Sequence, residues 1–138
     1  MRDFSALLKI KKEELKGLEI EIQRENQKRD SVKEDIENLY TEISKFSLPK
    51  SGNISEINAL KESVYLLNEE IKRKKDFLKE IDLKIEKLKE DYQELSVEYE
   101  KIKYLNEVEE KKRKEAKEER ERKELDDIAS ILFARRER

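Results

Sequence analysis

The chain has 138 residues, 49% of them charged and 7% aromatic, and its 33 basic and 35 acidic side chains leave a net charge of −2. This composition excludes a conventional layered core, because apolar side chains are too scarce to fill one. The absence of Cys and His excludes a disulfide, a thiol nucleophile, a histidine base and a zinc site. With no excess of positive charge, DNA and RNA are not expected partners.

Membrane insertion is not expected either. The longest apolar runs, "VYLL" and "ILFA", are far shorter than the roughly 20 residues that cross a bilayer. The N-terminus lacks the apolar core of a signal peptide. We therefore expect a cytoplasmic protein, and the missing cysteines fit a reducing compartment.

The first predicted element is a helix over residues 3–46. Its apolar side chains recur in alternating steps of three and four residues, a period that is typical of a coiled coil. Eleven of the fourteen positions of this seam are apolar, and the full set is Met1, Phe4, Leu8, Lys11, Leu15, Leu18, Ile22, Glu25, Arg29, Val32, Ile36, Leu39, Ile43 and Phe46. Gly17 lies outside the seam, where it should cost about 1 kcal/mol relative to Ala.

A bend is predicted at residues 47–54, within "FSLPKSGNIS". Pro49 and Gly52 interrupt the helical pattern there, and Asn53 precedes Glu56 at the spacing of a capping box. A connection this short makes the helices on either side antiparallel neighbours.

The second predicted helix covers residues 55–134 and repeats the same steps of three and four. Its seam has one polar member, Lys74, and consists of Ile57, Leu60, Val64, Leu67, Ile71, Lys74, Leu78, Ile81, Ile85, Leu88, Tyr92, Leu95, Tyr99 and Ile102. The predicted fold is all-α, an antiparallel two-helix coiled-coil hairpin with a longer, protruding C-terminal helix. Residues 1–138 are expected to form a single domain.

The pairing register is predicted by placing Phe46 opposite Ile57, so that facing residue numbers add up to 103. Arg29 then meets Lys74, which gathers most of the polar seam residues in one place. Polar seam residues commonly fix register at some cost in stability. In this register Lys11 faces Tyr92, and the first helix ends opposite residue 102, so residues 103–138 overhang by about 54 Å if helical.

The overhang combines dense charge with an apolar tip. Opposite charges four residues apart, such as Glu118 and Arg122, help a helix without a partner to stay helical. An apolar stripe then restarts, followed by arginines that complement the negative end of the helix dipole. The tip residues are Leu125, Ile128, Ile131, Leu132, Phe133, Arg135 and Arg136. This pattern suggests insertion into a partner; the alternatives are a solvated spacer with a sticky end and a homodimer contact.

Three apolar residues lie outside the seam near the bend: Tyr40, Tyr65 and Leu66. Together they could form a small docking patch. Equally, single exposed apolar residues are common on protein surfaces.

In architecture the whole chain resembles the flagellar FliJ family and its injectisome counterparts in type III secretion. The opening "FSALLKIKKEELKGLEIEI" is similar to the start of the family, and "KELDDIA" resembles its closing pattern, carried here by Lys123, Leu125, Asp126, Asp127, Ile128 and Ala129. The resemblance implies a non-enzymatic, cofactor-free component of the export apparatus, the central stalk of a hexameric export ATPase. It also implies contacts with a membrane-embedded export gate and with export chaperones.

On this resemblance the tip residues become the expected ATPase-binding segment, and Tyr40, Tyr65 and Leu66 the expected gate-binding residues. Two alternatives remain at this point: a structural or scaffolding coiled coil, and an export chaperone or stalk of the injectisome type. An enzyme is not expected, because a two-helix rod has no concave pocket that excludes water and shifts pKa values.

Overall fold

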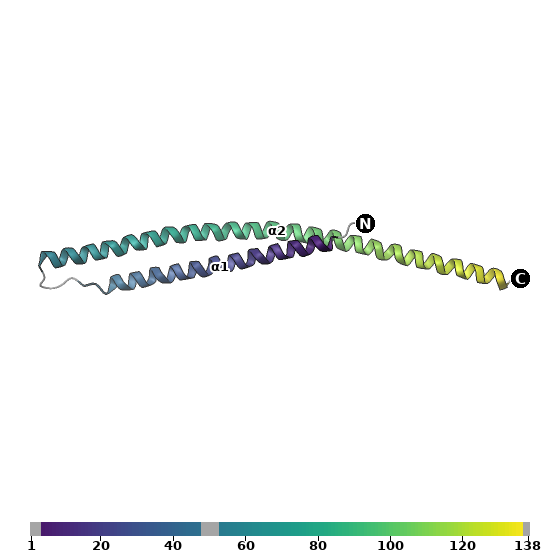
Figure 1. Cartoon of the computed structure of the whole chain (residues 1–138), viewed down its shortest axis with the longest axis horizontal. Coiled ribbons are helices and arrows are strands. Elements are labelled where there is room, and N and C mark those ends of the chain that lie inside the picture. Colours follow the sequence, from purple (N-terminus) through teal and green to yellow (C-terminus); the bar gives the residue numbers. More distant parts are fainter. Residues whose placement is uncertain (1–3, 48–52, 137–138) are drawn as a thin grey trace. The chain divides into compact units, whose positions relative to one another are not determined.

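The computed structural model describes residues 4–47 and 53–136, which form two helices, α1 (Ser5–Ser44) and α2 (Ile54–Arg136) (Figure 1). Each helix end lies within two residues of its predicted position. The described residues contain no strand, which confirms the predicted all-α helical hairpin. Pro49 and Gly52 of the predicted bend lie outside the described residues.

Local hydrogen bonds explain where the helices end. At the start of α2 the backbone N–H of Glu56 donates to Asn53 Oδ1 at 2.8 Å, so Asn53 is the N-cap that its spacing predicted. At the end of α1 the Phe46 N–H donates to the Ile43 carbonyl at 3.0 Å. The Ser44 hydroxyl donates to the carbonyl of Thr41 at 2.6 Å. These bonds satisfy carbonyls that would otherwise lack partners in the last turn.

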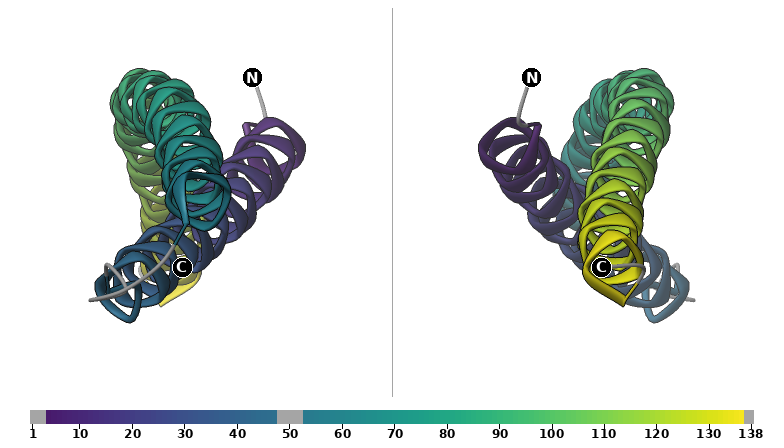
Figure 2. Two further views of the ribbon diagram at one scale, coloured as in Figure 1. Left: turned by 90° about the vertical axis from the view of Figure 1, so that its left-hand side faces the viewer. Right: turned by 90° about the vertical axis from the view of Figure 1, so that its right-hand side faces the viewer.

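The chain divides into two compact units. We call Leu15–Glu94 the bend unit, and Met1–Glu14 with Leu95–Arg138 the terminal unit. In the bend unit α1 and α2 run antiparallel, side by side (Figure 1), and among the described residues no third element covers the pair (Figure 2).

The core of the bend unit is made of seam residues. Its buried cluster is Val32, Ile36, Leu39, Ile71, Ile81 and Ile85, against which Ile43, Leu67 and Leu78 pack. Fully burying such a side chain is worth roughly 1.5 to 3 kcal/mol, so this cluster is the main source of stability for the pair. Every described seam position of the two helices is buried or half-buried except Phe46, which is 39% exposed at the end of α1.

The predicted register was wrong by one heptad. The hydrogen bonds and ion pairs between the helices of the bend unit join residues whose numbers add up to 109 or 111, on average seven above the predicted 103. These contacts pair Glu25 with Lys84, Glu19 with Tyr92, Arg29 with Asp82, and Asp35 with Lys74.

Charge explains why the observed register is preferred. The predicted register would have placed Arg29 against Lys74, two cations in one layer. In the structure Arg29 lies 3.9 Å from Asp82, and Lys74 lies 3.5 Å from Asp35. Each basic seam residue therefore has its own carboxylate, while its aliphatic stem can cover the seam.

The terminal unit pairs the start of α1 with α2 in the same register, because Lys11 Nζ lies 3.4 Å from Glu98 Oε2. Lys11 was predicted to face Tyr92, which instead bonds to Glu19 in the bend unit. The seam also extends further along α2 than expected, since Asn106 and Glu109 are still half-buried. The stretch that is exposed at every position begins at Lys114, not at residue 103, and continues to Arg136.

Candidate partner-binding surfaces

The last part of α2 presents an apolar stripe to solvent. Leu125, Ile128 and Leu132 recur at spacings of three and four residues, and so lie along one side of the helix. The exposed fractions of the five apolar side chains here are 67% for Leu125, 53% for Ile128, 56% for Ile131, 54% for Leu132 and 65% for Phe133. None contributes to either compact core, so burial against another molecule is the one way these side chains can stabilise anything.

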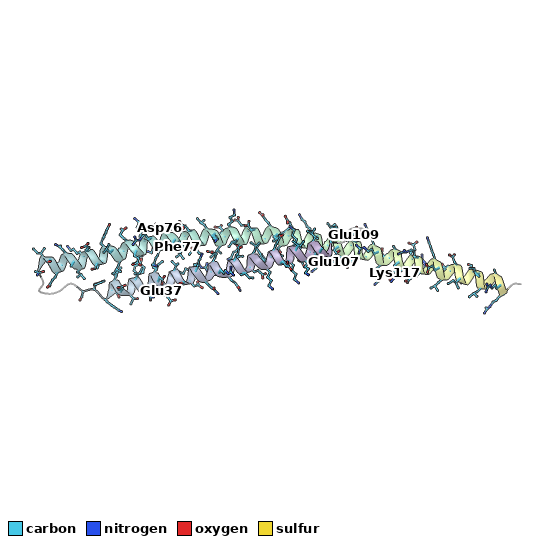
Figure 3. The ribbon with its side chains drawn as sticks, viewed as in Figure 1. Glu37, Asp76, Phe77, Glu107, Glu109 and Lys117 are labelled. Atoms are coloured by element: carbon cyan, nitrogen blue, oxygen red, sulfur yellow. The ribbon has the colours of Figure 1, made fainter. Side chains whose placement is uncertain are left out.

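The helix that carries this stripe has little support from ion pairs. Lys117 lies where α2 has no helix beside it (Figure 3). From Lys114 to Arg136 the described structure contains no ion pair within 4.0 Å, although Glu118 and Arg122 have the expected spacing. Exposed pairs of this kind are worth only a few tenths of a kcal/mol. The basic residues Arg135 and Arg136 do occupy the last turn, where they oppose the negative end of the helix dipole.

The residues predicted near the bend lie on two different flanks of the helix pair. In an antiparallel coiled coil, heptad positions e and b of both helices share one flank, and positions g and c share the other. Tyr40 and Tyr65 occupy the e/b flank, whereas Leu66 occupies the g/c flank. All three are exposed, at 47%, 62% and 59%. The structure therefore brings the two tyrosines to one surface and separates Leu66 from them.

One aromatic residue near the bend was missed by the sequence reasoning. Phe77 is 46% exposed on the g/c flank, eleven residues and about three turns beyond Leu66. It follows Asp76 on α2, at about the same level along the helix pair as Glu37 of α1, which lies on the other flank (Figure 3). Its position outside the seam was a signal that could have identified it.

Tyr40 makes a specific contact across the e/b flank. Lys75 Nζ lies 5.3 Å from the centroid of the Tyr40 ring, within the range of a cation–π interaction. This contact orients the ring on the surface of the bend unit while leaving almost half of the side chain exposed.

The pKa of Glu25 in the seam is held below its ordinary value, chiefly by the hydrogen bond that Lys84 donates. Burial of the carboxylate opposes this shift, and Lys28 adds to it. The pKa of Tyr92 is raised, mainly because its hydroxyl donates to the Glu19 carboxylate at 2.9 Å. Both shifts arise chiefly from hydrogen bonds that join the two helices.

The described residues offer no site for a metal. Residues 4–47 and 53–136 contain no group of three or more acidic, His or Cys side chains that could hold an ion. Within the same ranges no helix has the length and apolarity needed to cross a membrane. What the described surface does offer is exposed apolar side chains on long helices, the usual material of helix-in-groove recognition.

Comparison with models of protein families finds a match for this two-helix chain. The family model described as "Flagellar FliJ protein" matches residues 1–138, the whole chain. The chain belongs to the FliJ family. Neither the curated proteins nor the solved structures that were compared with it include a match. As a FliJ family member, the chain is a component of the flagellar type III protein export apparatus.

Proposed function

We propose that this FliJ family member is a non-enzymatic, cytoplasmic part of the export apparatus that acts as the central stalk of the hexameric export ATPase. At the export apparatus it would link the ATPase to the export gate in the cytoplasmic membrane and to export chaperones. The observation that supports this role best is the apolar stripe from Leu125 to Phe133, borne on a stretch of α2 that is exposed from Lys114 onward.

The stripe is the segment that we propose enters the channel of the hexamer. Burying a side chain such as Leu132 or Phe133 in a partner is worth roughly 1.5 to 3 kcal/mol, whereas in water it stabilises nothing. Arg135 and Arg136 follow the stripe and would meet acidic groups of the ring. Because the exposed stretch lies outside both cores, its insertion would cost the helix pair none of its own contacts.

The bend unit supplies the second proposed contact, with the export gate. Tyr40 and Tyr65 share the e/b flank and are both exposed. Tyrosine is enriched at interfaces, since its ring buries apolar area and its hydroxyl still finds a polar partner. Leu66 was expected to join them, but its place on the g/c flank gives it a smaller part in this proposal.

The test is a chain that ends at Glu124. Its thermal melting should match that of the full chain, because the seam ends well before that residue. It should lose both binding to the export ATPase hexamer and stimulation of ATP hydrolysis. Stimulation equal to that of the full chain would disprove insertion of the stripe, and an unfolded truncated chain would show that the stripe belongs to the fold instead.

A further inference from the structure

A row of lysines runs along α2 on the e/b flank of the bend unit. Its positions follow spacings of four and three residues without interruption, and are Lys61, Tyr65, Asn68, Lys72, Lys75 and Lys79. All six side chains are exposed. The row contains no acidic residue and extends over about 27 Å of helix.

Among the described residues of the bend unit, three lysines have a carboxylate partner, and the lysines of the row do not belong to this group. Lys28, Lys74 and Lys84 each lie within 4.0 Å of a carboxylate. Among the described residues no carboxylate lies that close to any lysine of the row. Lys75 of the row makes the cation–π interaction with Tyr40.

The charge is confined to one side of the helix pair. Within residues 31–47 and 61–79, the e/b flank carries five lysines and one acidic residue, Glu37. Over the same residues the g/c flank carries two basic and three acidic side chains. Over these residues the e/b flank therefore has a net charge of +4 and the g/c flank one of −1.

We infer that the lysine row, with Tyr40 and Tyr65, binds an acidic helix of a partner protein that lies along α2. This inference rests on the proposed gate-side contact of the two tyrosines and adds the charge of the partner to it. A straight row with spacings of three and four matches the carboxylates of a helix with the same spacing, pair by pair. The tyrosine rings supply apolar area beside the charges.

Two other polyanionic partners fit the flank less well. A nucleic acid needs a basic surface broad enough for its phosphates, and here the opposite flank is acidic. An anionic membrane surface binds best where exposed aliphatic side chains accompany the lysines, and the e/b flank has none over these residues.

The test uses the full chain and a synthetic helical peptide of about 20 residues, with glutamates at alternating spacings of three and four and alanine elsewhere. Fluorescence anisotropy should detect binding that weakens about tenfold when salt rises from about 0.05 to about 0.5 M. The same peptide with glutamine should not bind. A row variant should lose at least about tenfold in affinity; its substitutions are Lys61→Glu, Lys72→Glu, Lys75→Glu and Lys79→Glu.

A matched control makes the same change of charge on the other flank of the bend unit. It replaces exposed position-c residues and should bind like the unaltered chain: Arg24→Glu, Lys45→Glu, Arg73→Glu and Lys87→Glu. Both variants should keep their helicity by circular dichroism, since Glu is as good a helix former as Lys.

Equal loss of binding in both variants would overturn the inference, because it would show a response to net charge alone. The inference would also fail if the unaltered chain did not bind the peptide. It would fail too if the chain bound single-stranded RNA or phosphatidylserine vesicles more tightly than the peptide, and through the row. Row-dependent self-association would also overturn it. If the peptide binds but the gate protein does not, the row stands and the proposed gate contact fails.

Discussion

Glu25 and Lys84 join the two helices of the bend unit through a hydrogen bond of 3.1 Å, which Lys84 Nζ donates to Glu25 Oε1. Glu25 is the one buried charged residue in the described structure, with 6% of its surface exposed. A carboxylate in a seam costs stability unless it is paired, and here Lys28 provides a second partner at 3.4 Å. The contact can form only when facing residue numbers add up to about 110.

This pair predicts an acid-dependent contribution to stability. Because the pKa of Glu25 is lowered in the folded state, its contribution is complete above the unfolded value of about 4.3 and is lost as the pH falls through the lowered folded value. Glu25→Gln should lower the free energy of unfolding at pH 7 by about 1 kcal/mol or less, since Lys84 and Lys28 are more than half exposed. The melting temperatures of the two proteins should differ at pH 7 and should converge as the pH falls toward 2, below the lowered folded pKa of Glu25. A difference that stays constant with pH would contradict this account.

Engineered disulfides would distinguish the observed register from its neighbour. Ile43 and Leu67 pack against the same core, and their numbers add up to 110. Ile43→Cys with Leu67→Cys should therefore form a bond within one chain on mild oxidation. Ile36→Cys with Leu67→Cys should not, because a shift of one heptad, about 10.5 Å, exceeds the reach of a disulfide. Ready crosslinking of the second pair would restore the register that adds up to 103.

The seam could be predicted from the sequence and the register could not, for one physical reason. A heptad repeat matches apolar side chains equally well after a slip of seven residues. The repeat therefore identifies which residues lie in the seam, but not which residue of the other helix each of them faces. The choice depends on polar contacts such as Arg29 with Asp82, whose partner lies beside the seam and outside the repeat. The separation of Leu66 from Tyr40 was predictable from heptad positions; the cation–π contact with Lys75 required the register.

Gly17 offers a simple gain in stability. It lies inside α1 on the exposed side, and a Cβ added there would meet no atom within 4 Å. Gly17→Ala should therefore raise the free energy of unfolding by about 0.8 to 1 kcal/mol, the difference in helix propensity. Ala59→Gly, also exposed in a helix, should lower it by a similar amount. Chemical denaturation would measure both, and a destabilised Gly17→Ala would mean that the glycine serves a close approach.

Point substitutions in the tail test the proposed ATPase contact without shortening the chain. Ile128→Asp with Leu132→Asp should abolish stimulation of the export ATPase, because an unpaired charge would enter an apolar interface. Ser130→Asp with Ala134→Asp introduces the same charges, at the same spacing, on the other side of the helix and should retain stimulation. Both proteins should melt like the unaltered chain, since all four positions are exposed. Equal loss in both would point to the charge of the tail and not to its stripe.

The two flanks near the bend can be tested separately for gate binding. Tyr40→Ser with Tyr65→Ser should weaken binding to the gate protein by about tenfold or more, whereas Leu66→Ser with Phe77→Ser should change it little. Surface substitutions of this kind usually move stability by less than about 0.5 kcal/mol, so melting should be nearly unchanged for both. Isothermal titration calorimetry would measure the affinities. The reverse outcome would move the gate contact to the g/c flank.

The contact between Lys11 and Glu98 in the terminal unit has a consequence for length. It fixes where α1 begins along α2, and so fixes how many turns of α2 extend as a single helix. A slip of one heptad would change that length by about 10.5 Å while leaving the apolar seam matched. Apolar packing alone tolerates either length. Polar contacts such as this one therefore set the length of α2 that continues as a single helix, which apolar packing leaves open.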